Sequence, residues 1–130
     1  MKARLKELTS RSNGWGNDRR KDTLRQYIIG WVNYFKLADM NTLLLRIDEW
    51  FRRRIRMVIW KQWKLIKTKL MNLVKLGAKK SKAWEWANTR KGYWHIAKSF
   101  ILNTTITTHR LRQAGYLFLS DYYQKVRIKT

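Results

Sequence analysis

The sequence contains no cysteine, no proline and only 6 glycines among its 130 residues. Without cysteine it can form neither disulfides nor thiolate metal sites. All-β folds usually need turns built from proline and glycine, so their scarcity, together with helical periodicities along the chain, predicts an all-α fold. No apolar run approaches the roughly 18 residues needed to span a bilayer. Four of the first seven residues are charged, and this segment lacks the apolar core of a signal peptide.

Carboxylates are scarce as well: 8 Asp and Glu stand against 30 Lys and Arg, a formal charge of +22. Such a surplus costs stability through self-repulsion and therefore indicates a polyanionic partner, nucleic acid first. The acidic residues are scattered, and the adjacent Asp48 and Glu49 diverge by about 100° on a helix. They cannot converge on two metal ions, as nucleotidyl transfer requires.

The two histidines, His95 and His109, have no cysteine or glutamate at ligand spacing. We interpret them as hydrogen-bonding or phosphate-contacting residues rather than metal ligands. No glycine-rich phosphate loop and no nucleophile elbow occurs. The chain alone is therefore predicted to perform no chemistry and to need no metal or cofactor.

A hydrophobic content of 45%, with 14% aromatic residues, indicates a folded core rather than a disordered basic tail. Apolar periodicity predicts a helical bundle with one long amphipathic basic helix and several short helices. We expect residues 1–18 to form an N-terminal extension or linker and residues 19–127 to form the domain. The predicted helices cover 2–8, 22–36, 42–66, 68–76, 81–88 and 93–97, a segment carrying Leu111 and stopped at Gly115, and 119–126. Residues 101–108 are rich in threonine and β-branched side chains, so we predict an irregular connection there.

The long helix separates an apolar stripe from a basic one. On a helical wheel the apolar arc holds Leu44, Ile47, Phe51, Ile55, Val58, Ile59, Leu65 and Ile66. Trp50, Met57 and Trp60 project on the basic side. With the arginine cluster at 52–56 and the pair at 90–91, the predicted nucleic-acid contacts are Arg46, Arg52, Arg53, Arg56, Trp60, Lys61, Lys64, Lys67, Arg90 and Lys91. Arg53 and Arg56 are predicted to contact phosphates, so that replacing both by Ala causes little loss of fold, while Ile55 between them is core.

Trp60 has two interpretations. Arg56, Trp60 and Lys64 are spaced i, i+4, i+8, so they form one row along the predicted helix. If Trp60 is exposed, a base or sugar can stack on its indole while the cations hold phosphates, a contact worth roughly 1–3 kcal/mol. If it is buried, it packs against a second helix, such as that of residues 22–36, and its neighbours extend past it to solvent.

Several ordered motifs resemble the maturase-specific region of group II intron reverse transcriptases. In chain order they are IGWVNYF at 29–35, DEWFRRRIR at 48–56, WKQWK at 60–64, AWEWAN at 83–88, RKGYW at 90–94, and Leu111 followed by Gly115-Tyr116. The resemblance covers residues 20–125, nearly the whole chain. It departs from bacterial members at Ser99-Phe100, where they often carry Ser-Pro.

The resemblance implies a thumb, also called domain X: a helical bundle that grips the template–primer duplex and helps bind intron RNA during splicing. The family's Tyr-x-Asp-Asp palm motif, its fingers and its endonuclease module do not occur in this sequence. The implied partners are group II intron RNA, an RNA/DNA template–primer duplex, and a palm and fingers polypeptide supplied separately. The implied location is the bacterial cytoplasm, nucleoid-associated or bound in a ribonucleoprotein, with no membrane contact.

Two other classes of function compete. A basic structural RNA- or DNA-binding protein unrelated to intron mobility would account for the charge, although eight tryptophans are unusual in packaging proteins. An amphipathic membrane binder would need an apolar helix face free to insert, whereas here the core needs that face. Binding to structured RNA and to anionic vesicles at two salt concentrations distinguishes these classes.

Overall fold

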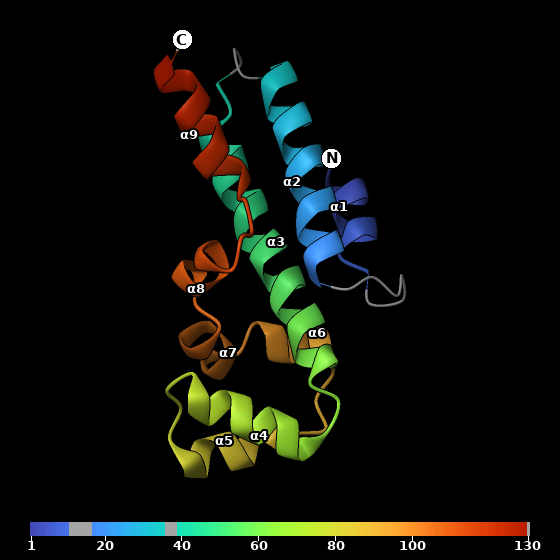
Figure 1. The fold of residues 1–130 in the computed structure, drawn as a ribbon, viewed down its shortest axis with the longest axis vertical. Coiled ribbons are helices and arrows are strands. Elements are labelled where there is room, and N and C mark those ends of the chain that lie inside the picture. The colour runs from blue at the N-terminus through green and yellow to red at the C-terminus, as the bar shows by residue number, and fades with distance from the viewer. Residues whose placement is uncertain (11–16, 36–38, 130) are drawn as a thin grey trace. The chain divides into compact units, whose positions relative to one another are not determined.

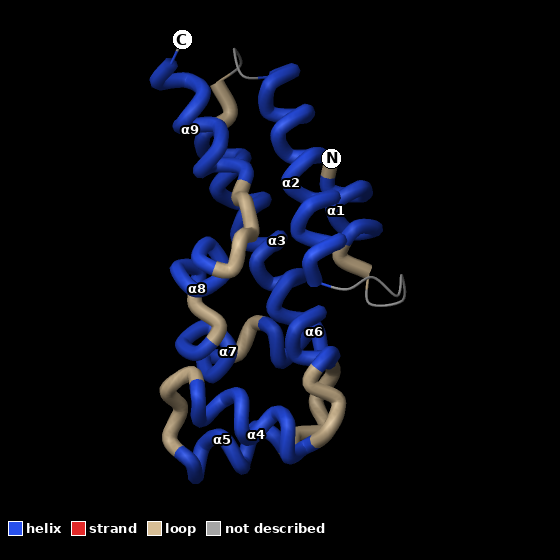
Figure 2. Tube along the Cα trace, viewed as in Figure 1, coloured by secondary structure: helices blue, strands red, loops and turns tan. Residues whose placement is uncertain are grey.

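The structure is a computed structural model that describes residues 1–10, 17–35 and 39–129. Within these ranges every element is a helix, nine in all, which confirms the all-α prediction (Figure 2). The helices are α1 (Lys2–Leu8), α2 (Asn17–Phe35), α3 (Asn41–Gln62), α4 (Ile66–Lys75), α5 (Lys80–Ala87), α6 (Tyr93–Ala97), α7 (Phe100–Thr105), α8 (Thr108–Gln113) and α9 (Leu119–Lys129). None of the helices described here is long and apolar enough to cross a membrane.

The chain divides into two compact units, and α3 contributes to both. The first, which we call the terminal unit, comprises residues 1–52 and 111–130. In it α2 packs against α1 and against α9 (Figure 1). Its core contains the fully buried rings of Phe51 and Phe118, whose centroids lie 5.9 Å apart in an edge-to-face arrangement. Such a pair adds to the stabilisation that burial alone provides.

The second unit, the central unit, comprises residues 53–110. Here α4 and α5 lie side by side as a helical hairpin, and α6 contacts α7 (Figure 1). Met57 and Val58 of α3 form a buried cluster with Ala97 of α6, and Tyr93 and Trp94 pack against it. The short helices of this unit are thus stabilised by packing rather than by their own length.

Helix ends marked by glycine lie where the sequence placed them. Gly77 and Gly115 have φ values of +106° and +104°, a conformation that glycine adopts without steric cost. After Gly77 the Ala78 N–H donates to the Leu73 carbonyl at 2.9 Å, and the Gly77 N–H donates to Val74. These two hydrogen bonds together form a Schellman motif, and the same pair of bonds occurs at Gly115. The predicted helices at 2–8 and 93–97 are also confirmed.

The long helix is shorter than predicted. It ends at Gln62 instead of Ile66, and Lys64 lies in the connection to α4. The predicted row from Arg56 through Trp60 to Lys64 is therefore broken. Leu65 and Ile66, expected in the apolar stripe, are 68% and 52% exposed. The segment between α3 and α4 contains neither glycine nor proline, and the apolar periodicity continues into α4. The sequence pattern therefore gives no sign that the helix ends there.

The prediction of an irregular connection at 101–108 is wrong for its first half, because α7 covers Phe100–Thr105. The Ser99 hydroxyl caps this helix by accepting from the Leu102 N–H at 3.4 Å. The hydroxyls of Thr104 and Thr105 donate to the carbonyls of Phe100 and Ile101, at 2.8 and 2.6 Å. Threonine can satisfy its hydroxyl inside a helix in this way, and propensity alone does not reveal it.

Candidate nucleic-acid interface

The structure separates the ten predicted contact residues into three groups by exposure. Arg46 and Arg52 belong to the terminal unit and the other eight to the central unit. Exposed are Arg46, Lys64, Lys67, Arg90 and Lys91; half-buried are Arg52, Arg53 and Lys61; buried are Arg56 and Trp60. The exposed members are free to meet a ligand, whereas the buried ones must be explained by the fold.

Trp60 is only 1% exposed, so the stacking prediction, which requires an accessible indole, is wrong. Its ring centroid lies 6.0 Å from that of Trp63, and the Lys69 Nζ lies 4.8 Å from the ring centroid. Burial lowers the pKa of Lys69. Met57, also placed on the basic side by the wheel, is buried beside Val58. The second half of α3 is thus buried over a wider arc than one apolar stripe.

Arg56 and Arg53 hold the central unit together. The buried Arg56 donates from Nε to the Ile106 carbonyl at 2.7 Å. Arg53 donates from Nε and Nη2 to the Trp94 carbonyl at 3.0 and 2.8 Å, and its guanidinium carbon lies 3.7 Å from the Trp94 ring centroid. Burial lowers the pKa of Arg53. The structure therefore gives both arginines partners within the fold, whereas the sequence analysis expected little loss of fold on their removal.

Arg110 makes a third contact of this kind, which the sequence analysis missed. Its Nη1 donates to the carbonyls of Leu76 and Thr105, at 2.6 and 2.7 Å. Leu76 is the C-cap of α4 and Thr105 is the last residue of α7, and Ile106, the partner of Arg56, is the C-cap of α7. Carbonyls at helix C-termini lack intrahelical partners and carry partial negative charge. These arginines thus satisfy helix ends.

The exposed cations of the central unit lie mainly on α4, α5 and the segments beside them. Besides those predicted, they include Lys75, Lys79, Lys80, Lys82 and Lys98. The run Lys79-Lys80-Ser81-Lys82 was a visible signal, but the sequence analysis concentrated on the long helix. Residues 53–110 hold 15 of the chain's 30 Lys and Arg and a single carboxylate, Glu85.

Glu85 can neutralise little of this charge. It lies 3.6 Å from the Lys82 Nζ, and both side chains are about two-thirds exposed. Exposed ion pairs of this kind contribute little to stability, because solvent screens the attraction between the two charges. The remaining cations of the central unit have no carboxylate of that unit to meet. The arrangement presents a field that attracts polyanions.

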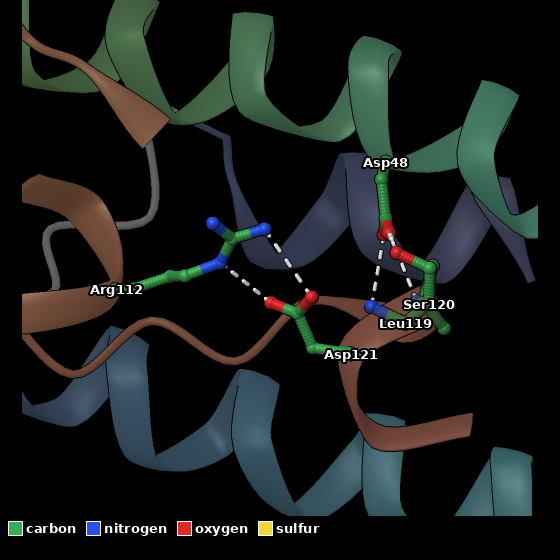
Figure 3. A network of polar contacts seen from close by, with 5 residues as sticks. All are labelled: Asp48, Arg112, Leu119, Ser120 and Asp121. Carbon is green, nitrogen blue, oxygen red and sulfur yellow. Dashed lines mark hydrogen bonds and ion pairs between the residues drawn. The ribbon is translucent and has the colours of Figure 1, made fainter. Parts of the chain in front are cut away.

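Two carboxylates of the terminal unit, Asp48 and Asp121, have structural partners (Figure 3). The buried Asp48 accepts from the N–H groups of Leu119 and Ser120 at 2.8 and 2.9 Å, and from the Ser120 hydroxyl. It thereby caps α9 from another helix. Burial raises the pKa of Asp48, while these hydrogen bonds and the nearby Arg52 oppose the shift. Arg112 binds Asp121 through two hydrogen bonds, at 2.8 and 3.2 Å.

The acidic side chains do not assemble into a metal site in the part of the chain that the structure describes. In comparisons with known proteins, the family model described as "Group II intron, maturase-specific domain" matches residues 1–100. A comparison with curated proteins gives no match. The matched range includes α1 to α6 and the exposed lysines at 79, 80 and 82.

Proposed function

The chain belongs to the group II intron maturase-specific domain family, and on that premise we propose that it binds RNA and assists intron splicing. In this proposal the domain contacts a group II intron RNA and grips an RNA/DNA template–primer duplex. It performs no chemistry itself, and a palm and fingers polypeptide supplies catalysis. We place it in the cytoplasm as part of a ribonucleoprotein.

The observation that carries the proposal is the charge of the central unit, 15 cations against one carboxylate. Lysine ammonium groups bind phosphate oxygens as point charges, and each contact releases counterions from the nucleic acid. The exposed Lys79 and Lys80, together with Lys64, Lys67, Arg90 and Lys91, are suited to that task. The buried Arg56 is not, because its guanidinium is committed to Ile106.

Salt dependence is the first test. If the domain neutralises about six phosphates, its affinity for a structured RNA should fall by roughly 10³-fold between 50 and 200 mM salt. Filter binding of the full chain to a group II intron RNA measures this, with an RNA/DNA hybrid duplex and anionic vesicles as parallel ligands. A nearly flat response would contradict phosphate binding, and tighter binding to vesicles would favour a membrane role.

A matched pair of double variants then locates the surface. Lys79→Ala with Lys80→Ala should lower RNA affinity by about tenfold or more and reduce the salt slope by about 2, because two phosphate contacts are lost. Arg25→Ala with Lys125→Ala removes the same charge from exposed positions of the terminal unit. This control should change affinity little. Equal losses in both variants would show that total charge, and not the surface of the central unit, determines binding.

A further inference from the structure

The central unit contains a cavity of about 380 Å³ between the α4–α5 connection, α5 and α7. Trp86, Phe100 and Ile101 form much of its wall, and Lys79 and Lys82 lie in its lining. The volume falls in the range of small-molecule pockets. Phe100 is 80% exposed although it is a large aromatic residue, so an apolar ligand at the cavity would cover surface that water now meets.

Hydrogen bonds within the chain hold part of the backbone that borders the cavity. The Schellman motif at Gly77 sets the path of the α4–α5 connection. Arg110 links the Leu76 carbonyl to the Thr105 carbonyl, so one guanidinium joins the connection to the end of α7. Because these bonds are made within the chain itself, they hold the backbone of the α4–α5 connection and of the end of α7 beside the cavity.

We propose that this cavity receives one unpaired nucleobase of the bound RNA, stacked on Trp86, with the flanking phosphates on Lys79 and Lys82. The inference rests on the proposed function, RNA binding. Three observations favour a base over an apolar peptide side chain: aromatic wall residues, cations in the lining, and the charge surplus around them. Lys91, whose Nζ lies 5.7 Å from the Trp86 ring centroid, adds a further cation beside the stacking residue.

Aromatic stacking tolerates every base, because each presents a π face. The cavity therefore selects for an unpaired nucleotide rather than for a sequence. A suitable probe is an RNA hairpin with one bulged nucleotide, compared with the fully paired hairpin and with the same bulge made abasic. The full chain should bind the bulged hairpin about tenfold more tightly than either control.

Thr104 offers a way to fill the cavity without removing a core residue. It is exposed, lines the cavity and bonds only to the carbonyls of its own helix, at Phe100 and Ile101. Thr104→Phe should abolish the preference for the bulge while affinity for the paired hairpin stays within about twofold. Thr104→Val, which loses the hydroxyl at nearly constant volume, should retain the preference. Thermal melting of both variants checks that the fold is intact.

The outcomes separate the two proposals. Salt-dependent RNA binding without any preference for the bulge would overturn the base site and leave the proposed function standing. A preference that persists in Thr104→Phe would place the base elsewhere and overturn this assignment. An equal preference for the abasic bulge would mean that backbone flexibility is recognised, and would also overturn it. Absence of RNA binding altogether would overturn both proposals.

Discussion

The two units of the chain stabilise their helix ends with side chains of opposite charge. In the terminal unit Asp48 accepts hydrogen bonds from the first N–H groups of α9. In the central unit Arg56 and Arg110 donate to carbonyls at the ends of α4 and α7. Each side chain has the charge opposite to the partial charge of the helix end that it contacts. The comparison shows how residues 53–110 fold with a single carboxylate: their cations do the structural work that Asp48 does in the terminal unit.

The central unit therefore has two populations of cations. Its arginines at 53, 56 and 110 bind backbone carbonyls, while its lysines on α4 and α5, apart from the half-buried Lys69, face solvent. Variants of the first population should alter stability, and variants of the second should alter RNA binding.

The largest effect is expected from Trp60→Ala. Removing a fully buried indole should lower the free energy of unfolding by about 4 kcal/mol, because the cavity left behind relaxes only in part. Urea denaturation followed by circular dichroism measures the loss. RNA affinity per folded molecule should not change. Normal stability combined with weakened RNA binding would show that Trp60 contacts RNA. It would contradict the assignment of Trp60 to the core of the central unit.

Asp48→Ala should cost about 3 kcal/mol. Two backbone N–H groups at the start of α9 and the Ser120 hydroxyl lose their common acceptor, and these groups are buried. Asp48→Asn keeps one carbonyl oxygen and should recover part of the loss. Asp121→Ala, which removes a more exposed pair with Arg112, should cost less than about 1 kcal/mol. Equal losses at positions 48 and 121 would contradict the capping role.

The smallest of the three effects is expected from Arg56→Ala, about 2 kcal/mol, because the Ile106 carbonyl loses a charged donor in a buried site. Lys79→Ala is the matched control and should change stability by less than about 0.5 kcal/mol. The two variants should rank in the opposite order for RNA affinity, measured under conditions where both are folded. A stable Arg56→Ala protein with weakened RNA binding would contradict the division between structural arginines and RNA-binding lysines.

Local signals in the sequence predicted much of the fold. Gly77 and Gly115 marked helix ends because only glycine adopts their φ values without strain, and apolar periodicity identified most helices. The end of α3 at Gln62 escaped prediction, because neither glycine nor proline marks it. The division of the chain after residue 18, between an N-terminal extension and the domain, stays a prediction.

The candidate site was harder to predict, because a helical wheel shows one side of a helix but not how many neighbours cover it. The carbonyl that Arg56 binds is 50 residues away in the sequence, and the one that Arg53 binds is 41 residues away. Such long-range contacts decide which cations are buried. The exposed cations at 64, 67, 90 and 91 remain candidates for phosphate contact.

The arginines that bind helix ends imply that, among related chains, lysine and arginine replace each other more freely at some positions than at others. At the solvent-facing positions of α4 and α5 any cation can meet a phosphate, so lysine and arginine should replace each other freely. At 53, 56 and 110 the planar guanidinium is required, because Arg53 stacks on Trp94 while donating twice to its carbonyl and Arg110 reaches two carbonyls at once. Lysine at those three positions should be rare, even in relatives whose total charge is the same.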